Sequence, residues 1–391
     1  MKAALAARAA GDHARAVQLW RAILAERPDD WQVALELKRD LKAGLHYPES
    51  DPAFRRAAAS LPDDEWVKHY AALYAYHGED LDVLDRRARA LLALRPDDRV
   101  VSMILGDVAA QRRDWAAAEA AYGAVGPEAR FKRDTAAMYR RLTGDGDGTA
   151  HYSVAFVNLD RNPERDAELR RQFAKSAPPL HRVPGIEGRR LSAAAVRRLG
   201  GNPQMRGTLG CFLSHAAAWE AMLDRGDAHC LIVEDDVIPL LDLPAGLDGL
   251  GLPDGFDLVF VNDRIAPRLD PADTQRFTTR SVEAAMLAFP ADDNAPGGDG
   301  YVLSAAGARK LLAWVAEDGF GDDVDWRLIA YAMSPAAIAA LPRPSHAGPW
   351  LDRIGASVGR ADRLDAHVLH PPLIRTVGVS SDREDENRMH G

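Results

Sequence analysis

A 34-residue period in the first part of the chain constrains its fold more than any other feature. The strings RPDD, LPDD and RPDD occupy residues 27–30, 61–64 and 95–98, so their prolines lie 34 residues apart. The same step joins two series of mostly apolar side chains, which are Trp20, Phe54, Ala88 and Tyr122, and Ile23, Ala57, Leu91 and Val125. A fixed period of this length is typical of stacked repeats in which each unit buries one face on its neighbours.

Each unit is predicted to be a helix, a short turn and a second helix that ends near the proline. A helix rarely continues through proline, because the ring removes a backbone donor and clashes with the preceding turn. Apolar side chains at spacings of three and four residues mark the buried stripe of the first helix, at Ala16, Leu19, Trp20 and Ile23. We therefore expect a series of helical hairpins.

These units resemble tetratricopeptide repeats. The shared features are the 34-residue period, the Gly11 turn, the large side chain of Trp20, the closing Pro28 and the Leu-Gly pair at 105–106. The resemblance implies an all-α tetratricopeptide-like repeat domain over residues 1–142. Such an array is either a scaffold that packs on the following domain or a groove for a protein partner or an acceptor, and the sequence leaves both readings open.

Composition and charge exclude several classes of protein. A chain of 391 residues that is 47% hydrophobic can bury enough apolar surface for two domains, and the Gly- and Asp-rich segment at 143–150 has the composition of a linker between them. A net charge of −9 gives nucleic acid no general attraction. The two cysteines, Cys211 and Cys230, are too few for a disulfide framework and lack the spacing of a structural zinc site.

The chain shows neither a secretion signal nor a membrane span. Charged residues interrupt the first apolar stretch before it reaches signal-peptide length. The longest apolar runs are strand-sized, far below the roughly 20 residues that a transmembrane helix needs. We expect a cytoplasmic protein whose membrane contact, where there is one, is peripheral at the inner membrane.

Short apolar runs alternate with helical patterns after the linker. The predicted strands lie at 152–158, 229–233, 256–261 and 301–303, and the predicted helices at 209–223 and 305–315. This alternation favours an α/β sheet domain over residues 151–391 with helices on its faces. Ligands of such sheets bind beyond the carboxyl ends of the strands.

An acidic triplet, Glu234, Asp235 and Asp236, directly follows the strand at 229–233. Adjacent carboxylates repel one another, and a divalent cation among them relieves that repulsion. Oxygen ligands suit Mg²⁺ or Mn²⁺ together with a phosphate-bearing substrate. The alternative is a solvated turn at the end of the strand.

Ser214 and His215 lie in the early turns of the helix predicted at 209–223. Hydroxyl and imidazole groups near a helix N-terminus can supplement the backbone donors that bind phosphate. The alternative for His215 is a structural histidine with satisfied hydrogen bonds. Cys211 is most simply a small buried residue.

Two later segments suit a sugar. The loop at 292–300 is rich in glycine and lets a sugar or a diphosphate approach the backbone, unless it is a simple turn. The string DDVDW at 322–326 sets carboxylates beside an indole, which matches the hydroxyls and the apolar ring face of a sugar. A helix-capping turn is the ordinary alternative for this string.

The order of these segments resembles glycosyltransferase family 25, the lipopolysaccharide galactosyltransferase-like family. The resemblance covers about residues 151–385 and rests on six strings, which are FVNLDRNPER at 156–165, GTLGCFLSH at 207–215, LIVEDD at 231–236, GYVLSAAGARKLL at 300–312, DVDW at 323–326 and PPLIRTVGVSSD at 371–382. It implies a GT-A-like nucleotide-sugar transferase domain. It also implies transfer of a hexose, typically galactose, from a UDP-sugar to an acceptor hydroxyl with inversion at the anomeric carbon.

The resemblance gives roles to the acidic residues. Asp236, helped by Glu234 and Asp235, would hold Mn²⁺ or Mg²⁺ against the diphosphate and offset the charge that develops as UDP leaves. Inversion by direct displacement needs a base at the acceptor hydroxyl. Asp325 is the first candidate for this base and Asp323 the second.

Five residues are assigned to the donor. Asn158, Asp160 and Arg165 follow the first predicted strand, where a nucleotide binds in this architecture. Ser214 and His215 are assigned to the donor side as well.

The acceptor and the partners stay open. A glycan or lipopolysaccharide-type acceptor, lipid-linked or not, is expected from the resemblance, and the excess of arginine over lysine suggests a bacterial genome. One alternative is a transferase that acts on a protein held by the repeats. Another is a repeat-based interaction protein whose transferase-like domain is inactive.

Overall fold

A computed structural model describes most of the chain as two compact units, one formed by Met1–Ala137 and the other by Met138–Val377. The described residues are 1–43, 52–58, 81–142, 152–174, 179–240, 243, 247, 250–264, 277–288, 297–321, 323–341 and 362–376. The predicted linker at 143–150 and the LPDD string at 61–64 lie outside them. The division between the units falls within a helix that ends at Leu142.

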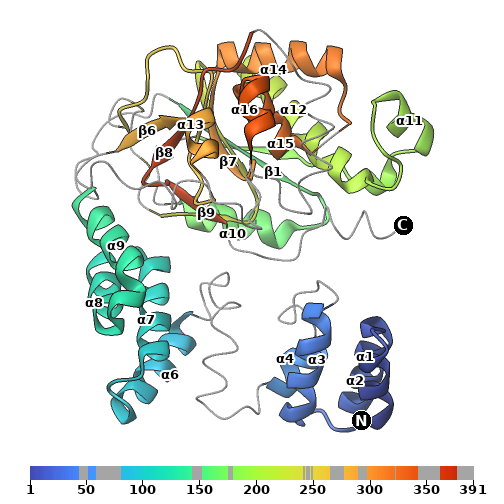
Figure 1. Ribbon diagram of the computed structural model, residues 1–391, viewed down its shortest axis with the longest axis vertical. Helices are drawn as coiled ribbons and strands as arrows, with labels where there is room; N and C mark the ends of the chain where they lie inside the picture. Colours follow the sequence, from blue (N-terminus) through green and yellow to red (C-terminus); the bar gives the residue numbers. More distant parts are fainter. Residues whose placement is uncertain are drawn as a thin grey trace. The chain divides into compact units, whose positions relative to one another are not determined.

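The first unit is helical throughout its described part (Figure 1). Its elements are α1 (Lys2–Ala9), α2 (His13–Glu26), α3 (Trp31–Ala43), α4 (Pro52–Ala58), α6 (Leu81–Leu94), α7 (Arg99–Gln111), α8 (Trp115–Val125), a 3-10 turn (Pro127–Ala129) and α9 (Arg130–Leu142), which continues into the second unit. Successive helices pack on one another, as α2 does on α3 and α7 on α8. The predicted helical hairpins are therefore present in the described residues.

The RPDD strings end one helix and begin the next. Helices α2 and α6 each end two residues before a proline, Pro28 and Pro96. The side chains of Asp30 and Asp98 then accept hydrogen bonds from the backbone N–H three residues ahead, at 3.2 Å. These bonds satisfy donors that the first turn of a helix leaves unpaired. One short string thus supplies both a stop signal and a cap.

The period of the sequence is also the period of the helices. Helix α6 begins 68 residues after α2, and α8 begins a further 34 residues on. The four side chains of the first repeated series are buried, and they are Trp20, Phe54, Ala88 and Tyr122. Gly106 lies so close to Tyr122 that a Cβ atom at Gly106 would come within 2.3 Å of the ring. The tetratricopeptide classification itself stays a prediction.

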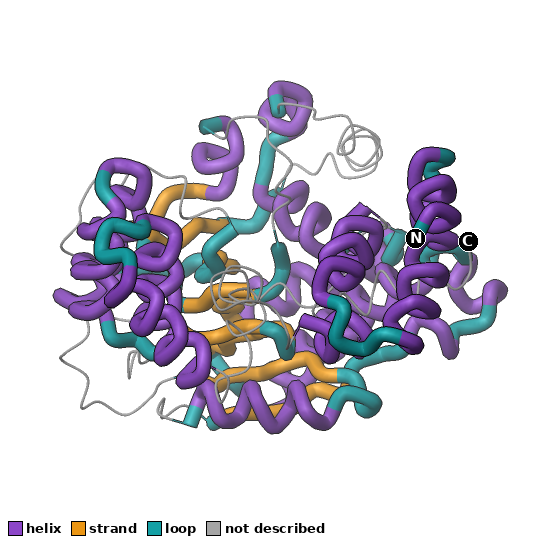
Figure 2. The backbone as a smooth tube through the Cα atoms, turned by 90° about the horizontal axis from the view of Figure 1, so that it is seen from below, coloured by secondary structure: helices purple, strands orange, loops and turns teal. Residues whose placement is uncertain are grey.

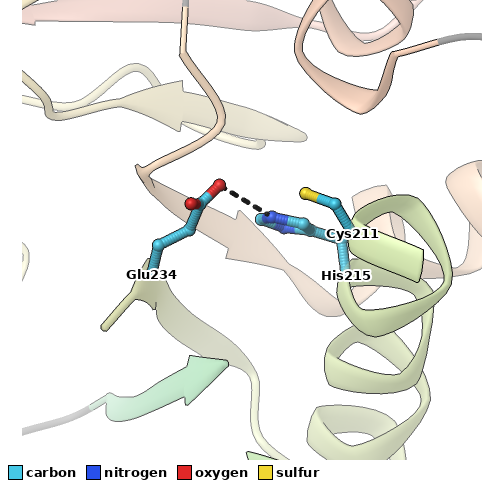
Figure 3. A group of neighbouring side chains, drawn as sticks. All are labelled: Cys211, His215 and Glu234. Atoms are coloured by element: carbon cyan, nitrogen blue, oxygen red, sulfur yellow. Dashed lines mark ion pairs between the residues drawn. The ribbon is translucent and has the colours of Figure 1, made fainter. Parts of the chain in front are cut away.

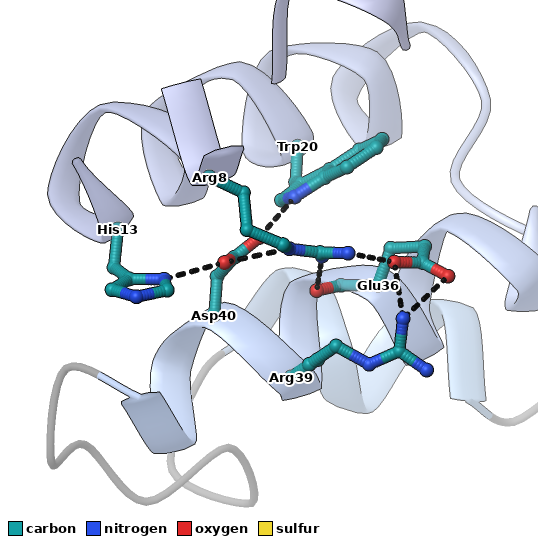
Figure 4. A network of polar contacts seen from close by, with 6 residues as sticks. All are labelled: Arg8, His13, Trp20, Glu36, Arg39 and Asp40. Atoms are coloured by element: carbon teal, nitrogen blue, oxygen red, sulfur yellow. Dashed lines mark hydrogen bonds and ion pairs between the residues drawn. The ribbon is translucent and has the colours of Figure 1, made fainter. Parts of the chain in front are cut away.

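A buried carboxylate ties the first three helices together (Figure 4). Asp40 on α3 is fully buried and accepts hydrogen bonds from the guanidinium of Arg8 on α1 and from the indole of Trp20 and the imidazole of His13 on α2, at 2.7 to 3.0 Å. Burial alone would raise the pKa of Asp40, but these bonds more than offset it and lower the pKa to about 2.

The second unit contains a seven-stranded mixed sheet with the strand order β2-β1-β3-β7-β5-β8-β6. These strands are β1 (Ser153–Asn158), β2 (Leu180–Pro184), β3 (His229–Glu234), β5 (Leu258–Phe260), β6 (Thr278–Ser281), β7 (Gly300–Ser304) and β8 (Ala366–His370). Strand β1 is parallel to β2 and β3, and β5 is parallel to β8, whereas β7 runs antiparallel to β3 and β5. A separate antiparallel pair joins β4 (Val237–Pro239) to β9 (Ile374–Thr376).

Helices cover both faces of the sheet, whose strands lie side by side (orange in Figure 2). The helices are α10 (Pro163–Phe173), α11 (Ala193–Arg198), α12 (Arg206–Arg225), α13 (Val282–Leu287), α14 (Ala305–Asp318), α15 (Val324–Ala332) and α16 (Pro335–Ala340), with a 3-10 turn at Gly188–Arg190. Helices α12, α14 and α15 pack together on one face and α10 lies on the other (Figure 1). Along β1, Ala155 accordingly belongs to the core under α12, while Phe156 contacts Arg170 of α10.

The four predicted strands and the two predicted helices of this region are confirmed within a few residues at their ends. Strands β2, β4, β6, β8 and β9 are not among the predicted ones. The architecture is compatible with a GT-A-like fold. None of the described helices is both long and apolar enough to cross a bilayer.

Candidate functional site

Polar residues lie at the ends of several strands along one edge of the sheet. Strands β1 and β3 run parallel and end there at Asn158 and Glu234. Strand β7 runs the other way, so Asp299 immediately before it lies at the same edge, and its carbonyl accepts a hydrogen bond from the N–H of Glu234 at 3.2 Å. Asn262 follows β5 and donates to Asp299 at 3.3 Å. This edge is where the sequence predicts ligand binding.

The acidic triplet at this edge does not form a single cluster. Glu234 turns toward α12, where one of its oxygens lies 3.5 Å from His215 Nε2. Asp235 turns toward α10 and accepts hydrogen bonds from Asn158 at 2.8 Å and Arg165 at 3.2 Å. Burial raises the pKa of Asp235, and Arg165 and Asn158 counteract that rise. Two of the three acids therefore have separate partners on opposite faces of the sheet.

Asp236 has the most unfavourable surroundings of the three. Its Oδ1 atom is buried and has no hydrogen-bond partner. Burial, followed by the carboxylates of Glu234, Asp235 and Asp299, raises the pKa of Asp236 well above its usual range. A buried acceptor that faces other acids is costly by itself, and a cation would stabilise it.

Asp299 is the centre of a polar group that sequence reasoning missed. It is 2% exposed and lies 2.9 Å from Nε of Arg264, and it also contacts the hydroxyl of Thr376. Asn262 donates to the carbonyl of Gly297 at 2.7 Å, which holds the chain just before Asp299. Burial raises the pKa of Asp299, against the lowering effect of Arg264. Asn262 and Arg264 come directly after a predicted strand, as the acidic triplet does, and this position could have identified them.

The two candidate bases have different local roles. Asp323 caps α15, and its Oδ1 accepts a hydrogen bond from the backbone N–H of Asp325 at 3.0 Å. Asp325 is 9% exposed and its Oδ1 accepts from the N–H of Gly298 at 2.7 Å. A Cβ atom at Gly298 would lie 2.7 Å from Asp325 and 3.7 Å from His215, so only a glycine fits between them without displacement. Asp325 and His215 thus flank one backbone segment.

Three of the five candidate donor residues contact the acidic triplet, and Asp160 and Ser214 have other partners. Asn158 and Arg165 meet at Asp235, and His215 lies beside Glu234. Asp160 is exposed and pairs with Arg182, a residue on the unpredicted strand β2, at 2.7 Å.

Ser214 is held by the backbone around it. Its hydroxyl donates to the carbonyl of Gly210 and accepts from the N–H of Ile186, both at 2.7 Å. These two hydrogen bonds anchor α12 to the segment after β2. Of the other predicted segments, residues 292–296 and 322 lie outside the described part of the chain.

Cys211, His215 and Glu234 come together at the N-terminal half of α12 (Figure 3). One ligand atom from each lies within 4.8 Å of the others. Among the described residues, they are the only three His, Cys, Asp or Glu side chains that meet this spacing. The predicted metal group of Glu234, Asp235 and Asp236 does not meet it.

Comparisons with known proteins point to one family. Residues 152–243 match the sequence model described as glycosyltransferase family 25 (LPS biosynthesis protein). The glycosyltransferase 25 family member of Aedes aegypti is 26% identical over 198 residues, which cover 46% of this chain and 31% of the relative. Procollagen galactosyltransferase 2 of Homo sapiens is 25% identical over 178 residues, or 41% of this chain and 27% of the relative.

A third relative carries a different functional description. The inactive glycosyltransferase 25 family member 3 of Mus musculus is 30% identical over 178 residues, or 41% of this chain and 28% of the relative. The chain thus matches less than a third of the length of each of these relatives. Residues 152–243 of the α/β unit thus match the model of glycosyltransferase family 25, the family whose name the relatives from Aedes aegypti and Mus musculus carry.

Proposed function

We propose that the α/β unit transfers a hexose from a UDP-sugar to an acceptor hydroxyl with inversion at the anomeric carbon. The observation that carries this proposal is Asp236, a carboxylate with a buried, unpartnered oxygen among other acids, at the sheet edge where ligands bind. The family match supports the reaction class. The names of the procollagen galactosyltransferase relatives support galactose as the sugar.

Asp236 is the residue best suited to hold a divalent cation. The cation, Mn²⁺ or Mg²⁺, would offset the negative charge that builds on the diphosphate as UDP leaves. An oxygen ligand with no hydrogen-bond partner fits these hard cations. Asp235 has a positioning role in this proposal, because Asn158 and Arg165 already hold its carboxylate. Glu234 supplies negative charge beside Asp236.

Arg264 supplies positive charge on the other side of the acids. Burial would lower the pKa of Arg264, but the carboxylates of Asp299, Asp325 and Glu234 raise it above its ordinary value, so the guanidinium stays charged. Its side chain is 40% exposed and therefore accessible to a ligand. A guanidinium that reaches solvent suits a phosphate oxygen of the donor.

Asp325 is the proposed base. The oxygen of the acceptor hydroxyl forms a bond to the anomeric carbon while the bond from that carbon to the diphosphate oxygen breaks. The hydroxyl proton passes to the Asp325 carboxylate, and the bonding electrons leave with UDP. The N–H of Gly298 and the Asp323 cap hold Asp325 in place. Asp323 therefore positions the base in this proposal.

Two acceptor classes follow from the comparisons. The family description names lipopolysaccharide biosynthesis, which supports a glycan acceptor, and the procollagen galactosyltransferases support a protein acceptor. A second candidate function is also supported, because two of the relatives are named as inactive or probably inactive. In that case the domain would keep its fold and serve binding alone.

The test is a panel of UDP-sugars incubated with the full chain. We expect Mn²⁺-dependent release of UDP from one UDP-hexose, with UDP-galactose first, and loss of release when a chelator removes the metal. Calorimetry on the same panel measures binding separately from turnover. Binding without turnover on glycan or collagen-type acceptors would favour the inactive domain. A lack of binding to every UDP-sugar in the presence of Mn²⁺ would overturn the proposal.

A further inference from the structure

We propose that Cys211, His215 and Glu234 form a second cation site, of the thiolate, imidazole and carboxylate class that prefers Zn²⁺. Cys211 and His215 lie one turn apart on the same side of α12, and Glu234 approaches them from the end of β3 (Figure 3). Their ligand atoms lie within 4.8 Å of one another. Tetrahedral zinc with such ligands separates neighbouring ligand atoms by about 3.5 Å, so small side-chain rotations complete the site.

A second observation points to the same place. His215 is fully buried, and its Nε2 atom has no hydrogen-bond partner although it faces Glu234 at 3.5 Å. Leaving a buried polar nitrogen without a partner costs free energy, and a bound cation removes that cost. Among the described residues, one other buried side-chain atom without a hydrogen-bond partner belongs to a residue with no further polar contact. This atom is Asp236 Oδ1, which the proposed donor site already uses.

The other nitrogen of His215 has the partner that a metal-binding histidine needs. Nδ1 lies 2.9 Å from the hydroxyl of Tyr301, which also accepts a hydrogen bond from the indole of Trp219 at 2.8 Å. When Nδ1–H donates to this hydroxyl, the lone pair of Nε2 points toward Cys211 and Glu234. That tautomer leaves Nε2 able to bind a cation, whereas donation from the Tyr301 hydroxyl to Nδ1 would place the ring proton on Nε2.

The ligand types separate this site from the proposed donor site. A thiolate and an imidazole select zinc over Mg²⁺ or Mn²⁺, whereas the lone carboxylate oxygen of Asp236 suits the hard cations. Zinc would tie α12 to the end of β3 through Glu234. The inference therefore does not depend on the proposed transfer reaction.

The experiment uses the full chain, stripped of metal with a chelator and then loaded with Zn²⁺ or with Co²⁺ as a spectroscopic substitute. We expect one Zn²⁺ per chain and, with Co²⁺, a near-ultraviolet thiolate-to-metal band. Cys211→Ser should remove the band and weaken Zn²⁺ binding by at least about tenfold. The matched control is Cys230→Ala, which removes the other cysteine and should leave both unchanged. Asp236→Asn should also keep the band, even where it abolishes sugar transfer.

A measurement on the unmodified protein guards against a variant that fails to fold. Zn²⁺ should protect Cys211 from alkylation, located by mass spectrometry, and Mg²⁺ at the same concentration should not. Absence of the Co²⁺ band in the unmodified chain, survival of the band in Cys211→Ser, or alkylation of Cys211 at an unchanged rate with Zn²⁺ would each overturn the proposal.

Discussion

The two units each bury aspartate oxygens, and the surroundings of these oxygens are opposite. Asp40 in the helical unit accepts hydrogen bonds from three side chains, and its pKa falls to about 2 (Figure 4). Asp236 in the α/β unit faces three other carboxylates, leaves Oδ1 without a partner and has a raised pKa. The hydrogen bonds to Asp40 stabilise its charge, whereas the charge of Asp236 is destabilised unless a cation binds.

This contrast separates a carboxylate that links helices from one that we propose binds a cation. Hydrogen bonds from Arg8, His13 and Trp20 make Asp40 a link between helices and leave no role for a ligand there. Perturbed acids that repel one another at the ligand edge of a sheet are typical of sites that bind or react. Substitutions at the two aspartates should therefore have opposite consequences for stability and activity.

The largest effect is expected at Asp236. Asp236→Asn should lower UDP release from the donor by about 10³-fold, because charge compensation of the leaving group is lost. The thermal midpoint of unfolding should stay the same or rise, since one of several mutually repelling charges is removed. Asp166→Asn, at an exposed pair with Arg170 on the same unit, is the matched control and should leave both quantities unchanged. If Asp236→Asn clearly lowered the thermal midpoint and kept UDP release, Asp236 would have a stabilising role like that of Asp40.

The next effect is expected at Asp40. Asp40→Ala should lower the free energy of unfolding of the helical unit by about 3 kcal/mol, because the buried donors of Arg8 and Trp20 lose their acceptor. Chemical denaturation followed by circular dichroism measures this change. The control is Arg39→Ala, which removes the exposed member of the same network and should cost less than about 0.5 kcal/mol. Equal losses in the two variants would refute the structural role of Asp40.

A smaller effect is expected from pH. The pKa of Asp40 is lowered from 3.8 to about 2 in the folded chain, so its stabilising contribution is complete above pH 4. That contribution, about 2 kcal/mol, is lost as the pH falls from about 4 toward 2. Unfolding free energies measured across this window should fall more steeply for the unmodified chain than for Asp40→Asn. Parallel curves would show that the carboxylate does not titrate as described.

The smallest effect is expected from a single donor of the network. Trp20→Phe keeps most of the buried ring but removes the indole N–H that donates to Asp40 at 2.7 Å. The free energy of unfolding should fall by about 1.5 kcal/mol, the lower end of the range for a hydrogen bond to a charged group. The same denaturation assay measures it. A loss as large as that of Asp40→Ala would mean that ring packing, and not the hydrogen bond, dominates at this position.

The sequence predicts the elements of the fold that carry local signals. The 34-residue series identifies buried positions such as Trp20 and Tyr122, and apolar runs identify β1, β3, β5 and β7. Strands β2 and β6 escape prediction because their sequences, LHRVP and TTRS, are polar or too short to show alternation. Strand β2 is joined to its partner β1 through α10, whereas β8, the partner of β6, comes from a distant part of the chain, so only the folded sheet supplies that second pairing.

The site is predicted less completely than the fold. The rule that polar residues follow a strand identifies Glu234 and Asp236, and the same rule applied to β5 would have found Asn262 and Arg264. The opposite directions of Glu234 and Asp235 also follow from alternation along a strand. The contact of Asp299 with Arg264 depends on the antiparallel register of β7 against β5, which no local pattern encodes.

We propose Asp325 as the base that removes the acceptor proton at a site that binds a UDP-sugar. The most direct measurement compares Asp325→Asn with Asp323→Asn for UDP-hexose binding by calorimetry and for sugar transfer. Asparagine still caps a helix, so Asp323→Asn should keep both activities. Asp325→Asn should bind the donor within about twofold of the unmodified chain and lose transfer by at least about 10²-fold. Undiminished transfer by Asp325→Asn would contradict the account.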